Sequence, residues 1–284
     1  MLGGMKDKLR HMATRSIERS ISRLSPEKRR EKAAGIIRDH YPLVLMYHSV
    51  VPQYTGENYT VSTATVEQNI VDLLADGYSF AFEDAFLRCQ PQSVILTFDD
   101  GFANNYTEVF PLLKKYNVKA SINMIADRIS EPKGEYLNEE QILEMEASGL
   151  VQFQSHTCSH RSLDRLTPEE VRFELAESKK KLEALLGRKV SAFAYPREDY
   201  TVEIAQMASE YYDLCYGWAG IMQIDQRYTL PRIEILEANS DYAYHVLYEH
   251  RMQNYHKVIW SLRKNKPKNV YQRVLFFLDE YRSN

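Results

Sequence analysis

The sequence predicts an α/β chain: a closed or nearly closed barrel of parallel strands and helices, with a helical extension at each end. Two observations support this class. Between residues 41 and 238, short apolar runs alternate with amphipathic helical patterns, as in repeated strand–helix units. The stretches on either side are basic and helical in spacing. The length of 284 residues, 44% of them hydrophobic, suits one barrel-sized domain with appendages.

The N-terminal extension, residues 1–40, has the pattern of a basic amphipathic helix. Ile17, Ile21 and Leu24 recur at helical spacing, and residues 1–32 hold ten Lys or Arg against four acidic residues, a net charge of +6. Because amphipathic helices mostly face a core, a helix packed on the domain with a solvated basic face is favoured. Peripheral contact with an anionic membrane surface is the alternative.

The central stretch, residues 41–238, alternates expected strands and helices. Gly77, Gly149 and Gly187 each follow a helical pattern, and Thr167 to Glu170 form a capping box. In chain order we expect strand Leu43–Tyr47, helix Val66–Asp76, strand Val94–Phe98, helix Thr107–Tyr116, strand Ala120–Ile125, helix Glu139–Ser148, strand Leu150–Gln154, a helix ending at Leu186, strand Ser191–Ala194, a helix from Val202, and strands near Leu214–Tyr216 and Leu230–Ile235.

The C-terminal extension, residues 239–284, is aromatic and basic. Residues 249–284 hold eight Lys or Arg against three acidic residues, a net charge of +5, between the apolar runs 258–260 and 274–278. A packed helical extension is the favoured interpretation. A membrane-surface or partner-binding patch is the alternative.

Composition excludes several classes of protein. The formal net charge of −3 argues against a nucleic-acid partner. No run of about 18 apolar residues predicts a transmembrane helix, and no secretory signal pattern follows the basic N-terminus. Three cysteines, Cys89, Cys158 and Cys215, cannot all pair within the chain, so reduced thiols are expected. Together these features predict a cytoplasmic protein.

The strongest motif is Thr97-Phe98-Asp99-Asp100-Gly101-Phe102, directly after an expected strand. Residues at the carboxyl end of a barrel strand face the mouth of the barrel. Two adjacent carboxylates there repel each other, a cost that a cation or a shared proton would relieve. Gly101 permits a sharp turn, so that both side chains can face one cavity. By itself, the motif would also suit an ordinary turn between strand and helix.

The second motif is Ser155-His156-Thr157-Cys158-Ser159-His160, after another expected strand. Histidines four apart share one face if the segment makes a helical turn, a spacing that suits one metal ion. Cys158 would then point away from that face. A polar loop with two solvated histidines is the alternative for this motif alone. Together, one carboxylate and two imidazoles predict a three-ligand site with open positions, which is typical of catalytic metals.

The two motifs in this order resemble the polysaccharide deacetylase family, the NodB-homology domain, over roughly residues 41–237. The resemblance implies a distorted (β/α) barrel, Asp99 as general base, and Asp100, His156 and His160 as ligands of one divalent metal. Zinc suits these ligands best, and cobalt, nickel or iron also fit. The implied reaction is hydrolysis of the N-acetyl amide of an N-acetylated sugar or glycan.

The sequence departs from the weaker motifs of that family. Ala194 occupies the place of an arginine in the third motif, and the late strand around Arg232 has no histidine. His48 ends the first strand, as in the circularly permuted poly-N-acetylglucosamine deacetylases, so we expect it to be the general acid. A packing histidine is the alternative. Arg232 is the candidate for the missing arginine and would hold Asp99 ionised.

Other assignments are less direct. The backbone N–H of Tyr106, or a neighbour, is expected to stabilise the oxyanion, and Trp218 either lines the acetyl pocket or belongs to the core. Two other functions remain. One is a catalytically impaired, deacetylase-like glycan-binding module. The other is a barrel phosphoesterase, which would often need two metals and more ligands.

Overall fold

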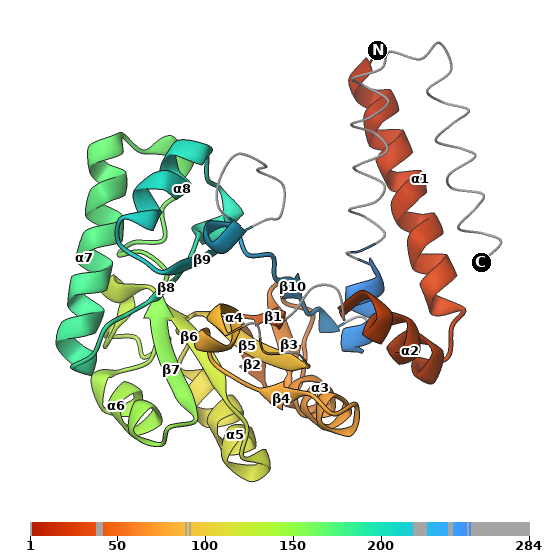
Figure 1. Cartoon of the computed structure of the whole chain (residues 1–284), viewed down its shortest axis with the longest axis horizontal. Helices are drawn as coiled ribbons and strands as arrows, with labels where there is room; N and C mark the ends of the chain where they lie inside the picture. Colours follow the sequence, from red (N-terminus) through yellow and green to blue (C-terminus); the bar gives the residue numbers. More distant parts are fainter. Residues whose placement is uncertain are drawn as a thin grey trace. The chain divides into compact units, whose positions relative to one another are not determined.

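The computed structural model describes residues 2–37, 42–88, 90, 92–217, 226–237, 241–248 and 250. The chain divides into two compact units, one of Met1–His40 with Asp241–Asn284 and one of Tyr41–Ser240. The larger unit is a curled sheet of parallel strands flanked by helices, a distorted barrel, as expected from the sequence (Figure 1). The smaller unit contains helices α1 (Leu2–Ser22) and α2 (Pro26–Ile37).

Strands and helices alternate along the larger unit. Its strands are β1 (Leu43–Tyr47), β2 (Ser49–Val51), β3 (Thr60–Ser62), β4 (Ser79–Phe80), β5 (Ser93–Asp100), β6 (Ala120–Met124), β7 (Val151–Ser155), β8 (Ala192–Ala194), β9 (Leu214–Tyr216) and β10 (Ile233–Glu234). Its helices are α3 (Thr63–Ala75), α4 (Asp84–Leu87), α5 (Phe110–Tyr116), α6 (Glu139–Ala147), α7 (Pro168–Leu186) and α8 (Val202–Ser209). A π-helical turn, Asn105–Val109, leads into α5. Elements β2, β3, β4 and α4 are too short to leave a periodic pattern in the sequence.

The sheet runs in the order β10-β1-β5-β6-β7-β8-β9, with β4 beside the start of β5. The paired strands are parallel, so their carboxyl ends share one rim. Residues 230–234 contact both edges of the sheet: Leu230 bridges Tyr216 of β9, and Ile233 pairs with Leu45 of β1. The first strand therefore lies beside the last.

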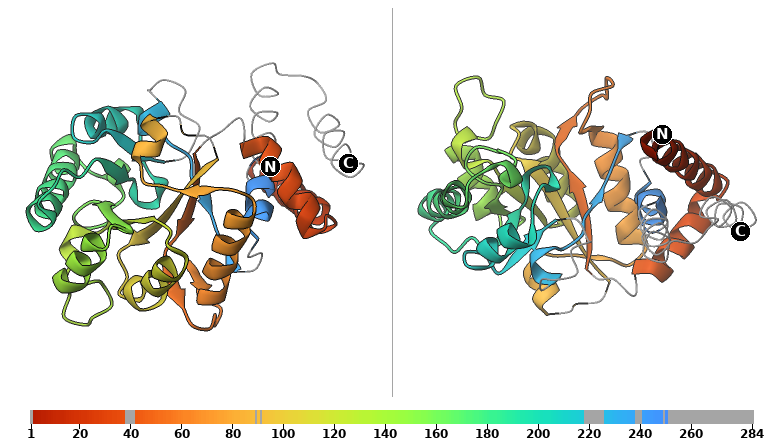
Figure 2. Two further views of the ribbon diagram at one scale, coloured as in Figure 1. Left: turned by 60° about the horizontal axis from the view of Figure 1, so that its bottom comes forward. Right: turned by 90° about the horizontal axis from the view of Figure 1, so that it is seen from above.

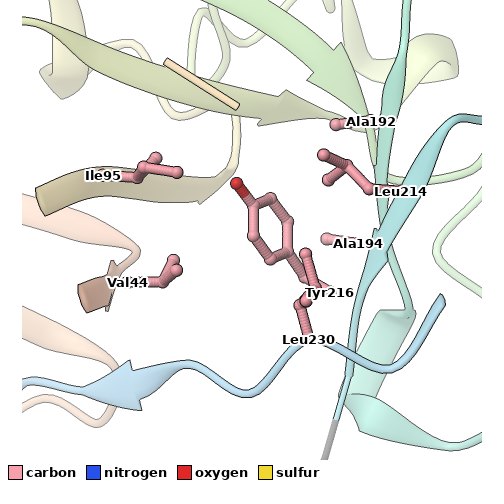
Figure 3. Close-up of a cluster of buried hydrophobic side chains, with 7 residues drawn as sticks. All are labelled: Val44, Ile95, Ala192, Ala194, Leu214, Tyr216 and Leu230. Carbon is pink, nitrogen blue, oxygen red and sulfur yellow. The ribbon is translucent and has the colours of Figure 1, made fainter. Parts of the chain in front are cut away.

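Inward-facing side chains fill the barrel. The cluster joins strands from opposite sides and consists of Val44, Ile95, Ala192, Ala194, Leu214, Tyr216 and Leu230. Figure 3 shows these side chains around the ring of Tyr216. Its hydroxyl donates to buried Glu83 (3.1 Å), which also accepts from Gln154 (3.1 Å). The alternation of β5 that turns Ile95 inward also turns Asp99 inward, at the rim.

Helices line the outside of the sheet, as both views in Figure 2 show. Helix α7 begins at the predicted capping box, in which the side chains of Thr167 and Glu170 bond reciprocally to backbone N–H groups. It ends at Gly187 in the left-handed conformation, with φ of 67°. Its buried face consists of Val171, Glu174, Leu175, Ser178 and Leu182. This face includes two polar residues besides the apolar ones.

The smaller unit packs the apolar face of α1 against residues near the C-terminal end of the described chain. Its buried cluster consists of Ala13, Ile17, Ile21, Tyr244 and Leu247. Arg29 pairs with Asp241 at 3.1 Å in the same unit. The apolar runs 258–260 and 274–278 lie outside the described residues.

Among the helices that the structure describes, none is both long enough and apolar enough to cross a membrane.

Candidate functional site

Two adjacent carboxylates end strand β5, and a backbone turn directs both toward the mouth of the barrel. In a regular strand, neighbouring side chains point to opposite faces. Asp100 adopts a φ of 71° and Gly101 a φ of 76°, so the chain leaves the strand geometry there. A Cβ atom on Gly101 would lie 2.5 Å from the sulfur of Met124, so a larger residue would require that side chain to move as well as a strained backbone. The predicted sharp turn is therefore present.

Asp100 meets both histidines of the second motif. Its Oδ1 lies 3.6 Å from Nε2 of His156 and 3.4 Å from Nε2 of His160. Ligands in a tetrahedral zinc site, each about 2.0–2.1 Å from the ion, lie about 3.3–3.4 Å apart. Asp100 Oδ1 is buried and has no hydrogen-bond partner among the residues that the structure describes. The three side chains form a candidate metal site whose spacing and unpaired oxygen fit a divalent ion.

The environment of His156 prepares it as a ligand. Its Nδ1 lies 2.8 Å from the carbonyl oxygen of Ala194, which can only accept, so Nδ1 carries the proton and Nε2 keeps its lone pair. Burial lowers the pKa of His156 to about 3, against the opposing charge of Asp99. Burial and the positive charge of Arg197 also lower the pKa of His160. Both imidazoles are therefore neutral at pH 7.

The two histidines are brought together by a loop rather than by the helical turn that their spacing suggests. Residues 156–160 follow β7 without forming a helix. Thr157 and His160 adopt left-handed φ angles of 68° and 60°. The two imidazole rings nevertheless lie 4.9 Å apart. A four-residue separation can thus be closed by a tight loop, and sequence spacing does not distinguish the two geometries.

Asp99 lies beside the candidate metal site and is held by Arg232, which directly precedes β10, two strands away from β5 in the sheet. Nη1 of Arg232 donates to Oδ1 at 2.7 Å, and Nη2 donates to Oδ2 at 2.8 Å. Asn123 of β6 also donates to Oδ1, at 2.7 Å. Burial alone would raise the pKa of Asp99, but the charge and hydrogen bonds of Arg232 outweigh it and hold the pKa well below its usual range.

His48, at the end of β1, faces the same carboxylate. Its Nε2 lies 4.0 Å from Asp99 Oδ2, the same distance that separates that oxygen from His156 Nε2. Its backbone carbonyl accepts a hydrogen bond from Asn105 (3.1 Å). Burial lowers the pKa of His48, while the nearby carboxylates oppose the shift. The imidazole lies 5.2 Å from the ring of Tyr59, which is 63% exposed.

The paired carboxylates carry the electrostatic cost that the sequence predicts. Burial and the neighbouring charge of Asp99 raise the pKa of Asp100 to about 6. Asp99 has Arg232 as its counter-charge, whereas Asp100 faces neutral imidazoles. A cation bound between Asp100 and the two histidines would balance this charge.

Three further sequence-based expectations have different outcomes. The N–H of Tyr106 already donates to the carbonyl of Ala103 at 3.0 Å in the turn before α5, which argues against Tyr106 as the oxyanion donor, and a neighbouring N–H stays a prediction. Cys158 is buried and is not part of the metal-site group. Trp218 lies outside the described residues. Asn123 was not singled out from the sequence, since a lone asparagine inside an apolar strand has no motif around it.

Comparisons with known proteins agree with this geometry. The sequence model for polysaccharide deacetylases matches residues 88–212. The Bacillus subtilis protein YxkH, named as a candidate polysaccharide deacetylase, is 31% identical over 194 residues, which cover 65% of this chain and 67% of that protein. The poly-beta-1,6-N-acetyl-D-glucosamine N-deacetylase of Staphylococcus aureus is 24% identical over 199 residues, 63% of this chain and 69% of that protein. The structure of the Streptococcus pyogenes deacetylase PplD in complex with acetate has a TM-score of 0.65 and 28% identity, covering 71% of this chain and 95% of that one.

Proposed function

Because the chain belongs to the polysaccharide deacetylase family, we propose that it removes acetyl groups from an N-acetylated glycan in a metal-dependent hydrolysis. The observation that carries the proposal is the position of Asp99 Oδ2. This oxygen lies 4.0 Å from Nε2 of His48 and 4.0 Å from Nε2 of His156. A base would thus stand between an acid and the metal site.

Asp100, His156 and His160 would hold the metal ion. Zinc suits one carboxylate and two imidazoles, and cobalt, nickel or iron would accept the same ligands. When bound, the ion supplies Lewis-acid chemistry: it polarises the acetyl carbonyl and brings the pKa of a bound water toward about 7. In the described part of the chain, these residues form a single candidate group, which favours one metal over the two-metal site common in phosphoesterases.

Asp99 would take a proton from the attacking water through Oδ2. Its Oδ1 is already occupied by Arg232 and Asn123, whereas Oδ2 faces the two histidines and accepts only from Arg232 among these donors. The bidentate arginine prevents the carboxylate from rotating and keeps it ionised. A low pKa makes Asp99 a weak base, which would suffice only for a water acidified by an ion that Asp100, His156 and His160 would hold.

His48 would give a proton to the amide nitrogen as the C–N bond breaks. The water oxygen becomes part of acetate, and the sugar leaves as a neutral amine instead of a high-energy amine anion. Burial lowers the pKa of His48, which makes its protonated form a stronger acid. Asp99 Oδ2, only 4.0 Å away, is close enough to stabilise that protonated form.

Aromatic side chains near the site suit a pyranose substrate. Tyr59 is exposed beside His48, and Phe102, the last residue of the carboxylate motif, stacks on Tyr136 with ring centroids 5.3 Å apart. The flat faces of such rings pack well against the apolar C–H faces of sugars. An N-acetylglucosamine polymer is therefore the substrate class we favour, in keeping with the name of the Staphylococcus aureus relative.

The alternative, a glycan-binding module without catalysis, needs no ordered base, acid and ligand set. The arrangement of Asp99, Asp100, His156 and His160 favours the enzyme. Ala194, which occupies the place of the family's arginine, does not weaken the case for an enzyme. Arg232, directly before β10, donates to Asp99 in its place.

Acetate release tests the proposal. Oligomers of β-1,6- and β-1,4-linked N-acetylglucosamine and nucleotide N-acetyl sugars would be incubated with the protein and either Zn²⁺, Co²⁺ or a chelator. We expect metal-dependent release, lost in Asp99→Asn and strongly reduced in His48→Ala. Matched controls are Asp84→Asn, exposed on α4, and His11→Ala, exposed on α1. Metal binding without acetate release from any substrate would instead favour the binding module.

A further inference from the structure

We infer that Glu174 on helix α7 is a positioning residue, which holds the loop between the two metal-site histidines in its binding conformation. The inference rests on the proposed metal site and is independent of the substrate. Glu174 is 3% exposed and lies on the buried face of α7, among Val171, Leu175 and Ser178. A buried carboxylate is costly unless it meets strong hydrogen-bond donors.

The loop itself requires external support. Thr157 and His160 both adopt left-handed φ angles, of 68° and 60°, although neither is glycine. Such conformations persist only where surrounding contacts enforce them. His160 donates its N–H to Oγ1 of Thr157 at 3.0 Å, a contact internal to the loop. That bond cannot by itself fix the loop relative to the barrel.

Glu174 provides the missing support from outside the loop. Its Oε2 accepts hydrogen bonds from the N–H of Cys158 at 2.8 Å and the N–H of Ser159 at 3.0 Å. Its Oε1 accepts a short hydrogen bond from the hydroxyl of Ser159. Hydrogen bonds to an ionised carboxylate are roughly twice as strong as neutral ones. One side chain therefore fixes the middle of the segment that separates the two ligand histidines.

The opposite side of the loop is fixed by the turn that follows β6. The N–H groups of Ala126 and Asp127 donate to the carbonyls of Thr157 and Cys158, each at 3.0 Å. One turn further along α7, the hydroxyl of Ser178 lies 2.9 Å from that of Ser155, the last residue of β7. The carbonyl side of the loop and its start thus have other anchors, whereas the N–H groups of Cys158 and Ser159 depend on Glu174.

Removal of the Glu174 carboxylate should weaken metal binding by Asp100, His156 and His160. The buried N–H of Cys158 and the partly buried N–H of Ser159 would lose their partner, and the loop would relax to satisfy them. The Nε2 atoms of His156 and His160 would then no longer be held near Asp100. Loss of a residue that orients metal ligands typically weakens metal binding by about 10- to 100-fold.

Metal affinity measures this directly. The dissociation constant for Zn²⁺ would be determined by competition with a chromogenic chelator, for the wild type, Glu174→Ala and Glu177→Ala. Glu177 is the matched control, since it lies on the same helix with a side chain 28% exposed. We expect binding about 10- to 100-fold weaker in Glu174→Ala and unchanged in Glu177→Ala. The visible absorption of bound Co²⁺ should change in Glu174→Ala only, while far-ultraviolet circular dichroism stays that of the wild type.

Zn²⁺ affinity in Glu174→Ala equal to that of the wild type would overturn the inference. If that variant does not fold, amide hydrogen exchange in the metal-free wild type decides: slow exchange at Cys158 and Ser159 supports the inference, and exchange at the rate of an open loop overturns it. Neither readout involves acetate release. A protein that deacetylates nothing but loses Zn²⁺ on Glu174→Ala would refute the proposed function and leave the inference standing.

Discussion

Replacement of Arg232 by methionine should destabilise the metal-free protein. It should also reverse the direction in which the contribution of Asp99 to stability changes with pH. Arg232 and Asp99 are 1% and 2% exposed, and two hydrogen bonds of 2.7 and 2.8 Å join them. Methionine keeps the length of the side chain but leaves Asp99 without its counter-charge. Removal of one partner of a buried pair typically costs about 3–5 kcal/mol, because the other charge remains buried.

The sign of the pH dependence follows from the pKa of Asp99. In the wild type the pKa of Asp99 is depressed, so the pair with Arg232 stabilises the fold at pH values above the unfolded-state pKa of about 3.9. This stabilisation is lost as the pH falls through the folded-state pKa. Without Arg232, burial is the dominant influence and raises the pKa. The variant then loses stability as pH rises through the raised pKa. The difference in unfolding free energy from the wild type should therefore be larger at pH 7 than at pH 5.

Urea denaturation with a chelator present, at pH 5 and pH 7, measures both quantities. The control is Arg172→Met, which removes an arginine from a bidentate pair with Glu210 on the surface, 44% and 53% exposed. It should cost about 0–1 kcal/mol at either pH. In Arg232→Met/Asp99→Asn, where both charges are gone, most of the lost stability should return. A cost below about 1 kcal/mol for Arg232→Met, or no recovery in the double variant, would refute this account of the pair.

Three further predictions concern activity. Asp99→Asn should lower kcat by about 10²–10⁴-fold and leave the dissociation constant for Zn²⁺ close to that of the wild type. Loss of Zn²⁺ binding in this variant would show that Asp99 is a metal ligand instead of a base. His48→Gln should slow release from N-acetyl sugars by about 10²-fold or more but hardly affect an aryl acetate ester, whose leaving group needs no proton, and equal losses on both would contradict the acid assignment. Tyr59→Ala should raise KM for oligosaccharides roughly three- to tenfold at constant kcat, because loss of one stacking contact would remove up to about 1.4 kcal/mol of binding free energy, which corresponds to tenfold. The control is Tyr54→Ala, on the same loop and 38% exposed. An equal effect of both substitutions would argue against stacking on Tyr59.

Much of the fold could be predicted because it is encoded locally. The apolar run of β1 (Leu43–Tyr47) and the capping box and closing glycine of α7 coincide with the observed elements. Element ends were less accurate: β5 runs from Ser93 to Asp100 and so includes both carboxylates. The helix expected from Thr107 begins instead as a π-helical turn at Asn105. Local patterns predict that an element exists better than they predict where its hydrogen bonding stops.

The residues of the candidate metal site were predictable because each belongs to a short motif at a strand end. His48 and Arg232 were inferred only through a family resemblance, since nothing within a few residues of either marks it as functional. Asn123 and Glu174 were not inferred at all. Both are single polar residues inside otherwise ordinary strand or helix patterns, and their partners lie 24 and about 15 residues away in sequence.

The sequence by itself determined that carboxylates and imidazoles would stand at the carboxyl ends of parallel strands of one barrel, because strand periodicity and turn residues act over a few positions. Only the tertiary structure decided which distant groups meet them. Arg232 reaches Asp99 across 133 positions because residues 230–234 contact both β9 and β1. The same closure brings the end of β1, and with it His48, to the rim that holds the metal-site residues. Pairing between distant strands depends on the free energy of the whole packed barrel, and no local pattern of residues records it.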